Sequence, residues 1–339
     1  MNAANLRAEL AAMDRAIALA RRSAGHTRPN PPVGAVLVAS DGRIVSEGRH
    51  VRCGAPHAEA ACLAAAGRKR VSALANSPTL FCTLEPCSRP GRVGACTDAI
   101  VAAGVKRVVW AVSDPNPKNR NRAAQVLRRH GISTECWERS RDPEKRARAA
   151  EAAKLVAPFS KHVLAGLPYV TVKIAMSLDG RICDDSGAAR WISSPASRRE
   201  TAKLRETADV VMVGAETVRR DNPSLLCHTR KNDDLFRVVV TRSGRLPKNA
   251  QIFTDAAKDR TIVLRVGKGG FSDLRAALRH LGDKGFMHVL CEGGLELARA
   301  LAAEGLVDEW IAVVAPKVIG HGSLAKAFEF PGADRILRF

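Results

Sequence analysis

The sequence is poor in aromatic residues and contains no long hydrophobic run. Aromatic side chains make up 4% of its 339 residues, and only one of them is a tyrosine. Proteins that bind single-stranded nucleic acids stack bases on aromatic rings, so this scarcity argues against a nucleic-acid surface. No apolar stretch approaches the roughly 18 residues of a membrane span, and the amphipathic start lacks the apolar core and cleavage site of a signal peptide. We therefore expect a soluble protein that does not enter a membrane.

Acidic residues are in deficit. The chain has 34 Asp and Glu against 54 Lys and Arg, which gives a formal net charge of +20. Such a surface can bind the phosphates of nucleic acids, or it can attract small phosphorylated substrates and cofactors. Part of the charge lies in helical runs such as residues 139–154, where a solvated helix face is a sufficient explanation. Because aromatic residues are few, we favour small phosphorylated molecules over nucleic acid as partners.

The cysteines are too dispersed for a disulfide scaffold in a chain of this length. Nine are present, at positions 53, 62, 82, 87, 96, 136, 183, 227 and 291. Without an export signal they are best interpreted as reduced thiols in the cytoplasm, some of them free and some bound to metal.

The length allows two domains, each with its own core. Strand-like and helix-like segments alternate up to about residue 140, which predicts a three-layer α/β domain with a mostly parallel sheet. A charged, alanine-rich helical stretch follows, and we expect Pro158 and Pro168 to break it. A second, different α/β unit opens at residue 169. The predicted organisation is a domain over 1–145, a connector over 146–168 and a domain over 169–339.

A histidine and a glutamate lie two residues apart in "PHAEA", at the start of a predicted helix. Downstream, "LEPCSRPGRVGAC" places Cys87 and Cys96 nine positions apart, with Cys96 beginning another helix. One imidazole and two thiolates leave a fourth tetrahedral position open, as in catalytic zinc sites. His57 could instead cap its helix while the cysteines pack in a core. The order H-x-E, P-C, C is that of zinc nucleobase deaminases, so we interpret His57, Cys87 and Cys96 as ligands of one Zn²⁺ and Glu59 as the proton shuttle.

The same motifs resemble a known family. "RPNPPVGAVLV", "HAEA", "LEPC" and "DPNP" (114–117) are similar to the deaminase half of the bifunctional riboflavin-biosynthesis deaminase/reductases. "VKIAMSLDGRI", "WISS", "ADVVMVGAETVRRDNPSL" and "CEGG" are similar to the reductase half, in family order. The resemblance implies a cytidine-deaminase-like domain followed by a dihydrofolate-reductase-like domain. It also implies hydrolytic deamination of a ribosylaminopyrimidine phosphate made from GTP, then reduction of the ribosyl side chain to ribityl by NADPH.

For the deaminase half, the resemblance implies a set of substrate-binding residues. These are Asn30, His50, Arg89, Arg92, Asp114 and Asn116. The asparagines beside proline could instead only form turns. Arg89 and Arg92 replace a customary histidine and lysine, and "KNRNR" (118–122) replaces expected glycines. Arginines at these places can still bind phosphate.

For the reductase half, no G-x-G-x-x-G follows a strand, so a Rossmann site is not supported. The resemblance implies two sets of residues. Substrate-binding positions are Lys173, Asp179, Arg205, Leu225, His228, Arg230 and Glu292, and cofactor-binding positions are Ala175, Trp191, Ser193, Gly214, Thr217, Asp221, Gly293 and Gly294. Ala189 and His228 replace a customary serine and arginine.

Three functions remain open on the sequence. The first is the bifunctional enzyme, the second has one active half and one scaffold half, and the third is a nucleic-acid-editing deaminase. The few aromatic residues and the long cysteine spacing disfavour the third. From the family we expect a homo-oligomer, a dimer through the reductase half. Family chains continue past "DRILRF" into a final strand, so we expect that strand to be missing or supplied otherwise.

Overall fold

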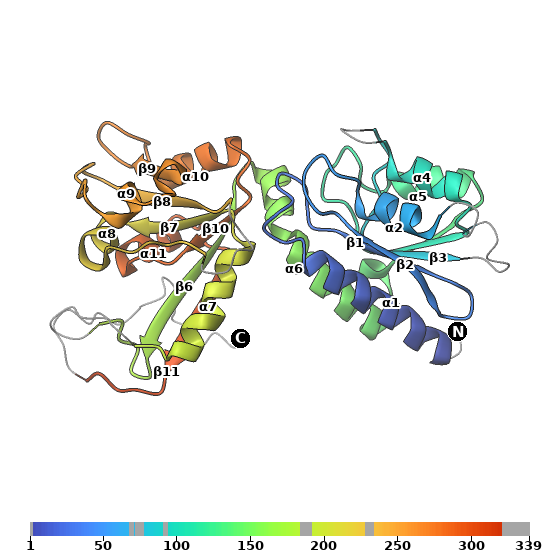
Figure 1. Ribbon diagram of the computed structural model, residues 1–339, viewed down its shortest axis with the longest axis horizontal. Coiled ribbons are helices and arrows are strands. Elements are labelled where there is room, and N and C mark those ends of the chain that lie inside the picture. Colours follow the sequence, from blue (N-terminus) through green and yellow to red (C-terminus); the bar gives the residue numbers. More distant parts are fainter. Residues whose placement is uncertain are drawn as a thin grey trace. The chain divides into compact units, whose positions relative to one another are not determined.

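The chain folds into two compact α/β units, Met1–Ala165 and Gly166–Phe339. The computed structural model describes residues 3–67, 71, 78–90, 94–183, 192–227 and 234–320. The expected final strand lies outside these residues. Figure 1 shows strands and helices alternating along the chain in both units, as the sequence predicts.

The first unit is built on a five-stranded sheet. Its strands are β1 (Gly34–Val38), β2 (Ile44–Arg49), β3 (Thr79–Leu84), β4 (Arg107–Val112) and β5 (Ser133–Cys136), in the order β2-β1-β3-β4-β5. β1 pairs antiparallel with β2 and with β3, whereas β3–β4 and β4–β5 are parallel. Four strands therefore run in one direction, as the expectation of a mostly parallel sheet requires, and β1 alone runs against them. The turn at Asp41-Gly42, with Gly42 at φ +84°, is too short for a crossover and makes β1 and β2 a hairpin.

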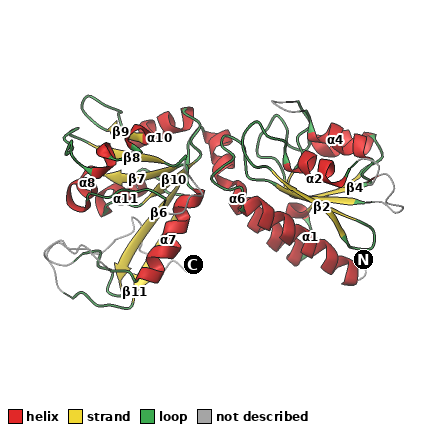
Figure 2. Ribbon diagram, viewed as in Figure 1, coloured by secondary structure: helices red, strands yellow, loops and turns green. Residues whose placement is uncertain are grey.

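Helices cover both faces of this sheet, giving the predicted three layers. They are α1 (Ala3–Arg21), α2 (Ala58–Ala66), α4 (Cys96–Ala103), α5 (Arg122–Arg129), η1 (Trp137–Arg139) and α6 (Pro143–Ala165). α2, α4 and α5 lie on one side and α1 and α6 on the other (Figures 1 and 2). α2 lies very close to β2, because a Cβ at Gly48 would be 2.4 Å from the Cys62 nitrogen. This close contact holds α2, which begins one residue after His57, against β2.

The helix α6 continues through Pro158, so the expected break there was wrong. Proline removes one backbone hydrogen bond from a helix, but the flanking residues are held by packing. Val156 is buried, and Phe159 packs against the core of the first unit. The stretch predicted as a connector thus forms a helix of the first unit up to Ala165.

The second unit contains a six-stranded sheet in which every pair is parallel. The strands are β6 (Tyr169–Ser177), β7 (Val210–Gly214), β8 (Phe236–Thr241), β9 (Thr261–Arg265), β10 (His288–Cys291) and β11 (Glu309–Ala315), in the order β11-β6-β10-β7-β8-β9. The central strands are apolar on both faces, as buried parallel strands are. In β7, Val210 and Met212 join one core and Val211 and Val213 the other.

Each of these two cores is closed by its own helices. Leu274 of α10 (Leu274–Asp283) and Leu297 of α11 (Leu295–Ala303) pack in the first. The second contains Val218 of α8 (Ala215–Asp221) and Ile252 of α9 (Gln251–Thr254), and Leu204 of α7 (Pro195–Thr207) packs against it. A short turn, η2 (Lys258–Arg260), precedes β9. Within the described ranges, no helix is long and apolar enough to span a bilayer.

Candidate active sites

His57 is the N-cap residue of α2, but its imidazole does not cap the helix. Its backbone is extended, and no side-chain cap hydrogen bond forms. The Nδ1 atom instead lies 3.3 Å from Cys96 Sγ and 3.5 Å from Cys87 Sγ. The alternative in which His57 only caps its helix was therefore wrong.

The two cysteines meet at the N-terminus of α4. Cys96 is the first residue of this helix, and its backbone N–H donates to Cys87 Sγ at 3.3 Å. Hydrogen bonds from the Cys96 thiol and from His57 lower the pKa of Cys87 to about 4. The hydrogen bond with Cys87, together with burial, raises the pKa of Cys96. A lowered pKa favours the thiolate form of Cys87, which is the form that binds metals.

The donor geometry fits a zinc ion. The three ligand atoms of His57, Cys87 and Cys96 all lie within 4.8 Å of one another. Tetrahedral zinc with Zn–N of about 2.0 Å and Zn–S of about 2.3 Å requires N···S separations of about 3.5 Å. The observed 3.3 and 3.5 Å meet that requirement. A set of three protein ligands leaves the fourth position for a reactant.

Glu59 lies in the first turn of α2 and is only 3% exposed. Burial raises its pKa to about 7. A carboxyl group with this pKa can both accept and release a proton near neutral pH. Glu59 lines a cavity of about 150 Å³ together with His57 and Cys87.

Asn30 and His50 line the same cavity and form a hydrogen bond with each other. His50 Nδ1 lies 3.1 Å from the Pro56 carbonyl oxygen, and its Nε2 lies 3.1 Å from Asn30 Nδ2. The carbonyl can only accept, so Nδ1 carries the proton and Nε2 accepts from the Asn30 amide. Burial lowers the pKa of His50, which favours this neutral ring. The orientation of the Asn30 amide in the cavity is therefore set by His50.

The remaining predicted residues of the first site divide into three groups. Asp114 lines the cavity, whereas Asn116 and Arg89 do not, and Arg89 is exposed. Arg92 lies outside the described residues. Five lining residues were not predicted: Pro31, Val33, Leu84, Glu85 and Phe159. Glu85 stands in the quoted "LEPC" motif and could have been found there, but Phe159 comes from α6 and carries no local signal.

A larger cavity of about 480 Å³ lies in the second unit, at the carboxyl ends of β6, β7 and β10. In a parallel sheet this edge is the usual place for ligands. It brings together eight of the predicted residues: Lys173, Ala175, Gly214, Thr217, Asp221, Glu292, Gly293 and Gly294. Glu216 and Arg220 of α8, which sequence reasoning missed, also line it.

Three charged side chains are coupled at this cavity. Arg205 Nε and Nη2 donate to the two carboxylate oxygens of Glu292 at 2.5 and 2.9 Å. Burial lowers the pKa of Lys173, while the nearby Glu292 carboxylate opposes that effect. Arg205 thus holds Glu292 in a bidentate pair beside the lysine.

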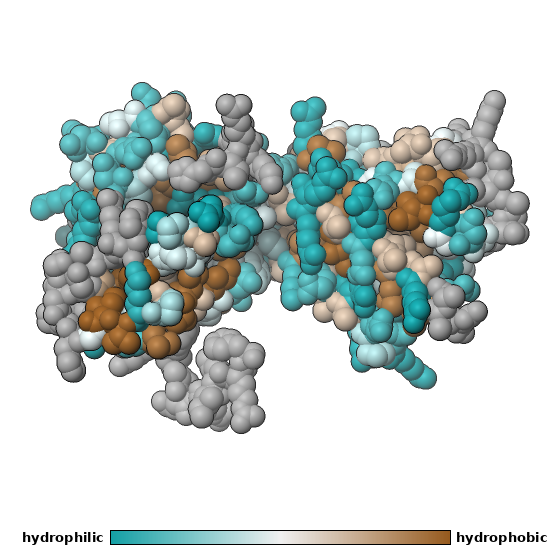
Figure 3. All heavy atoms as spheres, turned by 60° about the horizontal axis from the view of Figure 1, so that its bottom comes forward, coloured by the Kyte–Doolittle hydropathy of each residue, from teal (hydrophilic) through white to brown (hydrophobic). Residues whose placement is uncertain are grey.

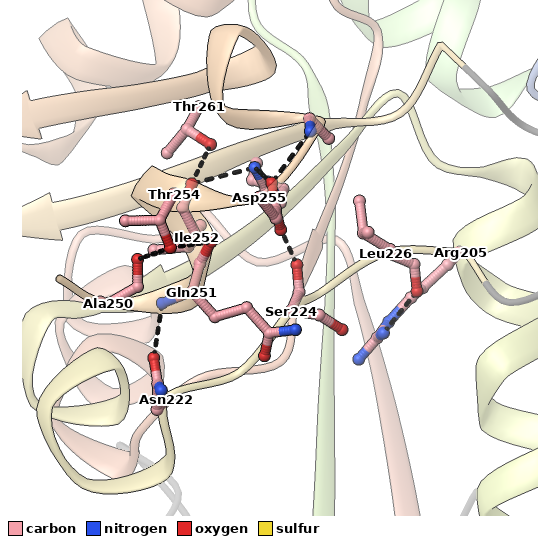
Figure 4. A network of polar contacts seen from close by, with 12 residues as sticks. Arg205, Asn222, Ser224, Leu226, Ala250, Gln251, Ile252, Thr254, Asp255 and Thr261 are labelled. Carbon is pink, nitrogen blue, oxygen red and sulfur yellow. Dashed lines mark hydrogen bonds and ion pairs between the residues drawn. The ribbon is translucent and has the colours of Figure 1, made fainter.

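Arg205 also belongs to the contacts that hold the segment after α8 (Figure 4). Its Nη1 donates to the Leu226 carbonyl at 2.9 Å. Arg237, which is fully buried on β8, donates to the Ser224 carbonyl at 2.9 Å and to both oxygens of Asp255. Leu225, between these carbonyls, has φ +54°. Two arginines therefore fix a backbone conformation that leucine seldom adopts.

Other predicted positions of the second unit lie elsewhere or are not described. Asp179 follows β6, accepts from the Ile319 and Gly320 amides and does not line the cavity. Leu225 is buried in a core, and Ser193 lines a separate hollow with Arg198 and Lys317. Trp191, His228, Arg230 and the departure at Ala189 lie outside the described residues.

Comparison with known proteins agrees with both units. Residues 7–112 match the family model described as the cytidine and deoxycytidylate deaminase zinc-binding region, and residues 168–335 match the RibD C-terminal domain. The chain is 36% identical to the riboflavin biosynthesis protein RibD of Escherichia coli (strain K12), over 96% of this chain and 92% of that protein. It is 34% identical to the protein of that name from Aquifex aeolicus (strain VF5), over 91% and 87%.

Solved structures show the same relationship over both units. Acinetobacter baumannii RibD, form 1, superposes with a TM-score of 0.81 at 34% identity, covering 97% of this chain and 93% of that one. A Thermotoga maritima structure, titled a diaminohydroxyphosphoribosylaminopyrimidine deaminase/5-amino-6-(5-phosphoribosylamino)uracil reductase, superposes with a TM-score of 0.82 at 32% identity. It covers 95% of this chain and 90% of that one.

Fold and sites together define a zinc-dependent deaminase joined to an NADPH-dependent reductase. More particularly, the chain belongs to the RibD family, the bifunctional deaminase/reductases of riboflavin biosynthesis. The fold class, the bifunctional activity and the two cofactors expected from the sequence are thereby confirmed.

Proposed function

We propose that the 150 Å³ cavity of the first unit deaminates 2,5-diamino-6-(5-phosphoribosylamino)pyrimidin-4-one, and that the 480 Å³ cavity of the second unit reduces the product's ribosyl side chain to ribityl. The observation that carries the proposal is the convergence of His57, Cys87 and Cys96 beside the buried Glu59. That set joins a three-ligand metal centre to a proton carrier in one small cavity.

In the deaminase, His57, Cys87 and Cys96 would hold the zinc ion. Zinc supplies Lewis acidity that makes water a nucleophile at neutral pH. The Glu59 carboxylate accepts a proton from the attacking water and donates it to the departing amino group. Its pKa of about 7 permits both transfers. Asn30, oriented by His50, and Asp114 hold the polar edge of the pyrimidine, while Phe159 supplies an apolar wall. Arg89 and Arg92 contact the substrate phosphate, and Asn116 the ribose.

In the reductase, the turn at Gly293-Gly294 leads into α11, whose N-terminal amides can hold a cofactor phosphate. Gly293 has no room for a side chain, since a Cβ would lie 2.6 Å from Val213 Cα. Lys173 and Glu292 face the substrate, and Arg205 keeps Glu292 in place. NADPH supplies the hydride. The other predicted residues keep the roles that the resemblance implies. Those for the substrate are Asp179, Leu225, His228 and Arg230. Those for the cofactor are Ala175, Trp191, Ser193, Gly214, Thr217 and Asp221.

One assay tests both activities. The purified protein is given the pyrimidine substrate with and without NADPH, and ammonia, NADPH and the pyrimidine products are followed. We expect the deaminated ribosyl compound alone without NADPH and the ribityl compound with it. Accumulation of the deaminated compound in the presence of NADPH would show that the reductase half is a scaffold. An unchanged substrate, with NADPH consumed once deaminated substrate is supplied, would show the reverse.

We also infer a dimer that forms through the reductase unit, in a reducing cytoplasm. Among the described strands β11 lies at the edge of its sheet, and edge strands pair readily with other chains. Figure 3 shows apolar side chains gathered on the part of the second unit where β6 and β11 end, and Leu178, Val314 and Val318 are 69%, 52% and 71% exposed. We expect light scattering to give a dimer, and Val314→Glu to shift it towards monomer. The nine cysteines are dispersed along the chain and do not have the spacing of a disulfide scaffold, which suits a reducing compartment.

A further inference from the structure

The segment "KNRNR" (118–122), which departs from the family pattern, contains a buried polar side chain. Asn119 lies between β4 and α5 and is 7% exposed, whereas Lys118, Arg120, Asn121 and Arg122 are exposed. Burying an amide is unfavourable unless its donors and acceptor are satisfied. The contacts of Asn119 therefore show what the segment is built around.

Both ends of the Asn119 amide are used. Its Oδ1 accepts from the Ser88 backbone N–H at 2.8 Å and from the Ser88 hydroxyl at 2.9 Å. Its Nδ2 donates to Asp114 Oδ2 at 2.8 Å and to the Pro86 carbonyl at 3.4 Å. Pro86 and Ser88 are the two neighbours of Cys87. One side chain thus joins the loop of a metal ligand to a carboxylate that lines the cavity.

The Asp114 carboxylate has its orientation set by two donors. The Asn116 backbone N–H donates to Oδ1 at 2.8 Å, and Asn119 holds Oδ2. The first contact is local and forms in any such turn. The second reaches across to the metal-ligand loop, so it ties the carboxylate to Cys87 as well as to the turn.

The backbone around Asn119 is anchored separately, by Glu85. The carboxylate of Glu85 accepts from the backbone N–H groups of Asp114, Asn121 and Ala123 at 3.0–3.2 Å. The fold of the segment therefore does not depend on Asn119 alone. What Asn119 adds is the link between Asp114 and the Cys87 loop.

We propose that Asn119 is a positioning residue of the deaminase, which sets the Asp114 carboxylate and the Cys87 loop in one fixed relation. The proposal rests on the proposed function for the contact between Asp114 and the pyrimidine substrate. The link to the Cys87 loop does not depend on that contact. A carboxamide is required, because the same side chain must donate to a carboxylate and accept from an amide.

Two variants distinguish the hydrogen bond from Asn119 to Asp114 from the hydrogen bonds between Asn119 and Ser88. Asn119→Asp keeps the acceptor for Ser88 but replaces the donor to Asp114 by a carboxylate oxygen. Asn119→Ala removes both kinds of hydrogen bond. Asn121→Gly is the matched control, since Asn121 is a neighbouring exposed asparagine at φ +63°, a conformation that glycine adopts freely.

The experiment uses the full-length, zinc-loaded protein. We expect Asn119→Asp to raise the deaminase KM about tenfold, the value of one charge-assisted hydrogen bond, with a smaller change in kcat and with zinc retained. Asn119→Ala should in addition lose zinc faster to a chelator than Asn121→Gly does. Reduction of already deaminated substrate should stay at the wild-type rate in all three variants, and a wild-type Tm of the first unit shows that the deaminase unit is folded.

Two results would overturn the proposal. One is a wild-type KM in Asn119→Asp together with a control-like rate of zinc loss in Asn119→Ala. The other is a fall of deaminase activity in Asn119→Asp that is matched by a fall in the Tm of the first unit, which would make the role of Asn119 merely structural. If the wild-type protein fails to deaminate the pyrimidine, the proposed function fails, and the chelator measurement alone still decides whether Asn119 holds the Cys87 loop.

Discussion

The side chains of His57, Cys87 and Cys96 come from two helix starts and one loop, yet they converge with zinc-like spacing. Each ligand is needed, because three protein donors are the minimum for a catalytic site. We expect Cys96→Ser to lose most of the zinc that wild-type protein retains, as measured by metal analysis after dialysis. Cys136→Ser, a change at a thiol that faces Ser113, is the control and should keep its zinc. A full complement of zinc in Cys96→Ser would exclude this ligand set.

Glu59 lies two residues from a ligand but does not belong to the ligand group. Glu59→Gln keeps the size and removes the titratable group, so we expect zinc to stay bound. Deamination should fall about a hundred- to ten-thousandfold, the usual contribution of a general acid–base group. Reduction of the deaminated substrate should be unchanged. Deamination at the wild-type rate would rule out the proton-transfer role.

Arg205 was expected to bind the substrate, and the structure pairs it with Glu292 and with the Leu226 carbonyl. Its removal leaves a nearly buried carboxylate without its bidentate partner. We expect Arg205→Ala to raise the reductase KM for the deaminated substrate about ten- to a hundredfold, the value of a charged hydrogen bond. Lys203→Ala, an exposed change on the same helix, is the control. Equal kinetics in the two variants would contradict the placement of this pocket.

At the scale of elements, β8 and the turn after α9 are joined by the pair between Arg237 and Asp255. The guanidinium is fully buried and donates to both carboxylate oxygens at 2.6 and 2.9 Å. Breaking a buried pair costs about 3 to 5 kcal/mol because one charge is left uncompensated. Asp255 is partly accessible, so we expect Asp255→Asn to lower the free energy of unfolding of the second unit by about 2 to 3 kcal/mol in urea. Asp259→Asn, an exposed change nearby, should have little effect.

The same pair has a pH dependence with a definite sign. Hydrogen bonds from Arg237 lower the pKa of Asp255 in the folded protein. The stabilisation is therefore present above the unfolded value of about 3.9 and is lost as the pH falls through the lower folded value. The stability difference between wild type and Asp255→Asn should accordingly be constant from pH 5 to 7 and shrink below about pH 4. A difference that persists unchanged at pH 2 would contradict this assignment.

At the scale of the whole molecule, each unit has its own core and its own cavity. A change that disturbs the cavity of one unit should therefore leave the activity of the other unit intact. We expect Gly293→Ala to abolish reduction, because its Cβ would lie 2.6 Å from Val213 Cα, while deamination continues. Ammonia release and NADPH oxidation measured on the same preparation test this. Loss of both activities in Gly293→Ala would show that the units depend on each other.

Local patterns in the sequence were enough to name the three side chains that converge with zinc-like spacing and to predict most elements. Alternating and continuous apolar runs predict strands, and the H-x-E and P-C motifs predict a metal centre. Both kinds of pattern involve only residues that are close together in the sequence. Eight of the residues that line the larger cavity could be named from their motifs. The two-unit α/β architecture was also predictable from the order of the segments.

Contacts between distant residues were decided only by the tertiary structure. The antiparallel pairing of β1 with β3, the continuation of α6 through Pro158 and the pairing of Arg205 with Glu292 leave no local pattern. Phe159 reaches the deaminase cavity from a helix 72 positions after Cys87. The sequence by itself therefore determined which chemical groups are present and in which elements. Packing decided which of them meet, because burial selects the partners of a charged or polar group from the whole fold.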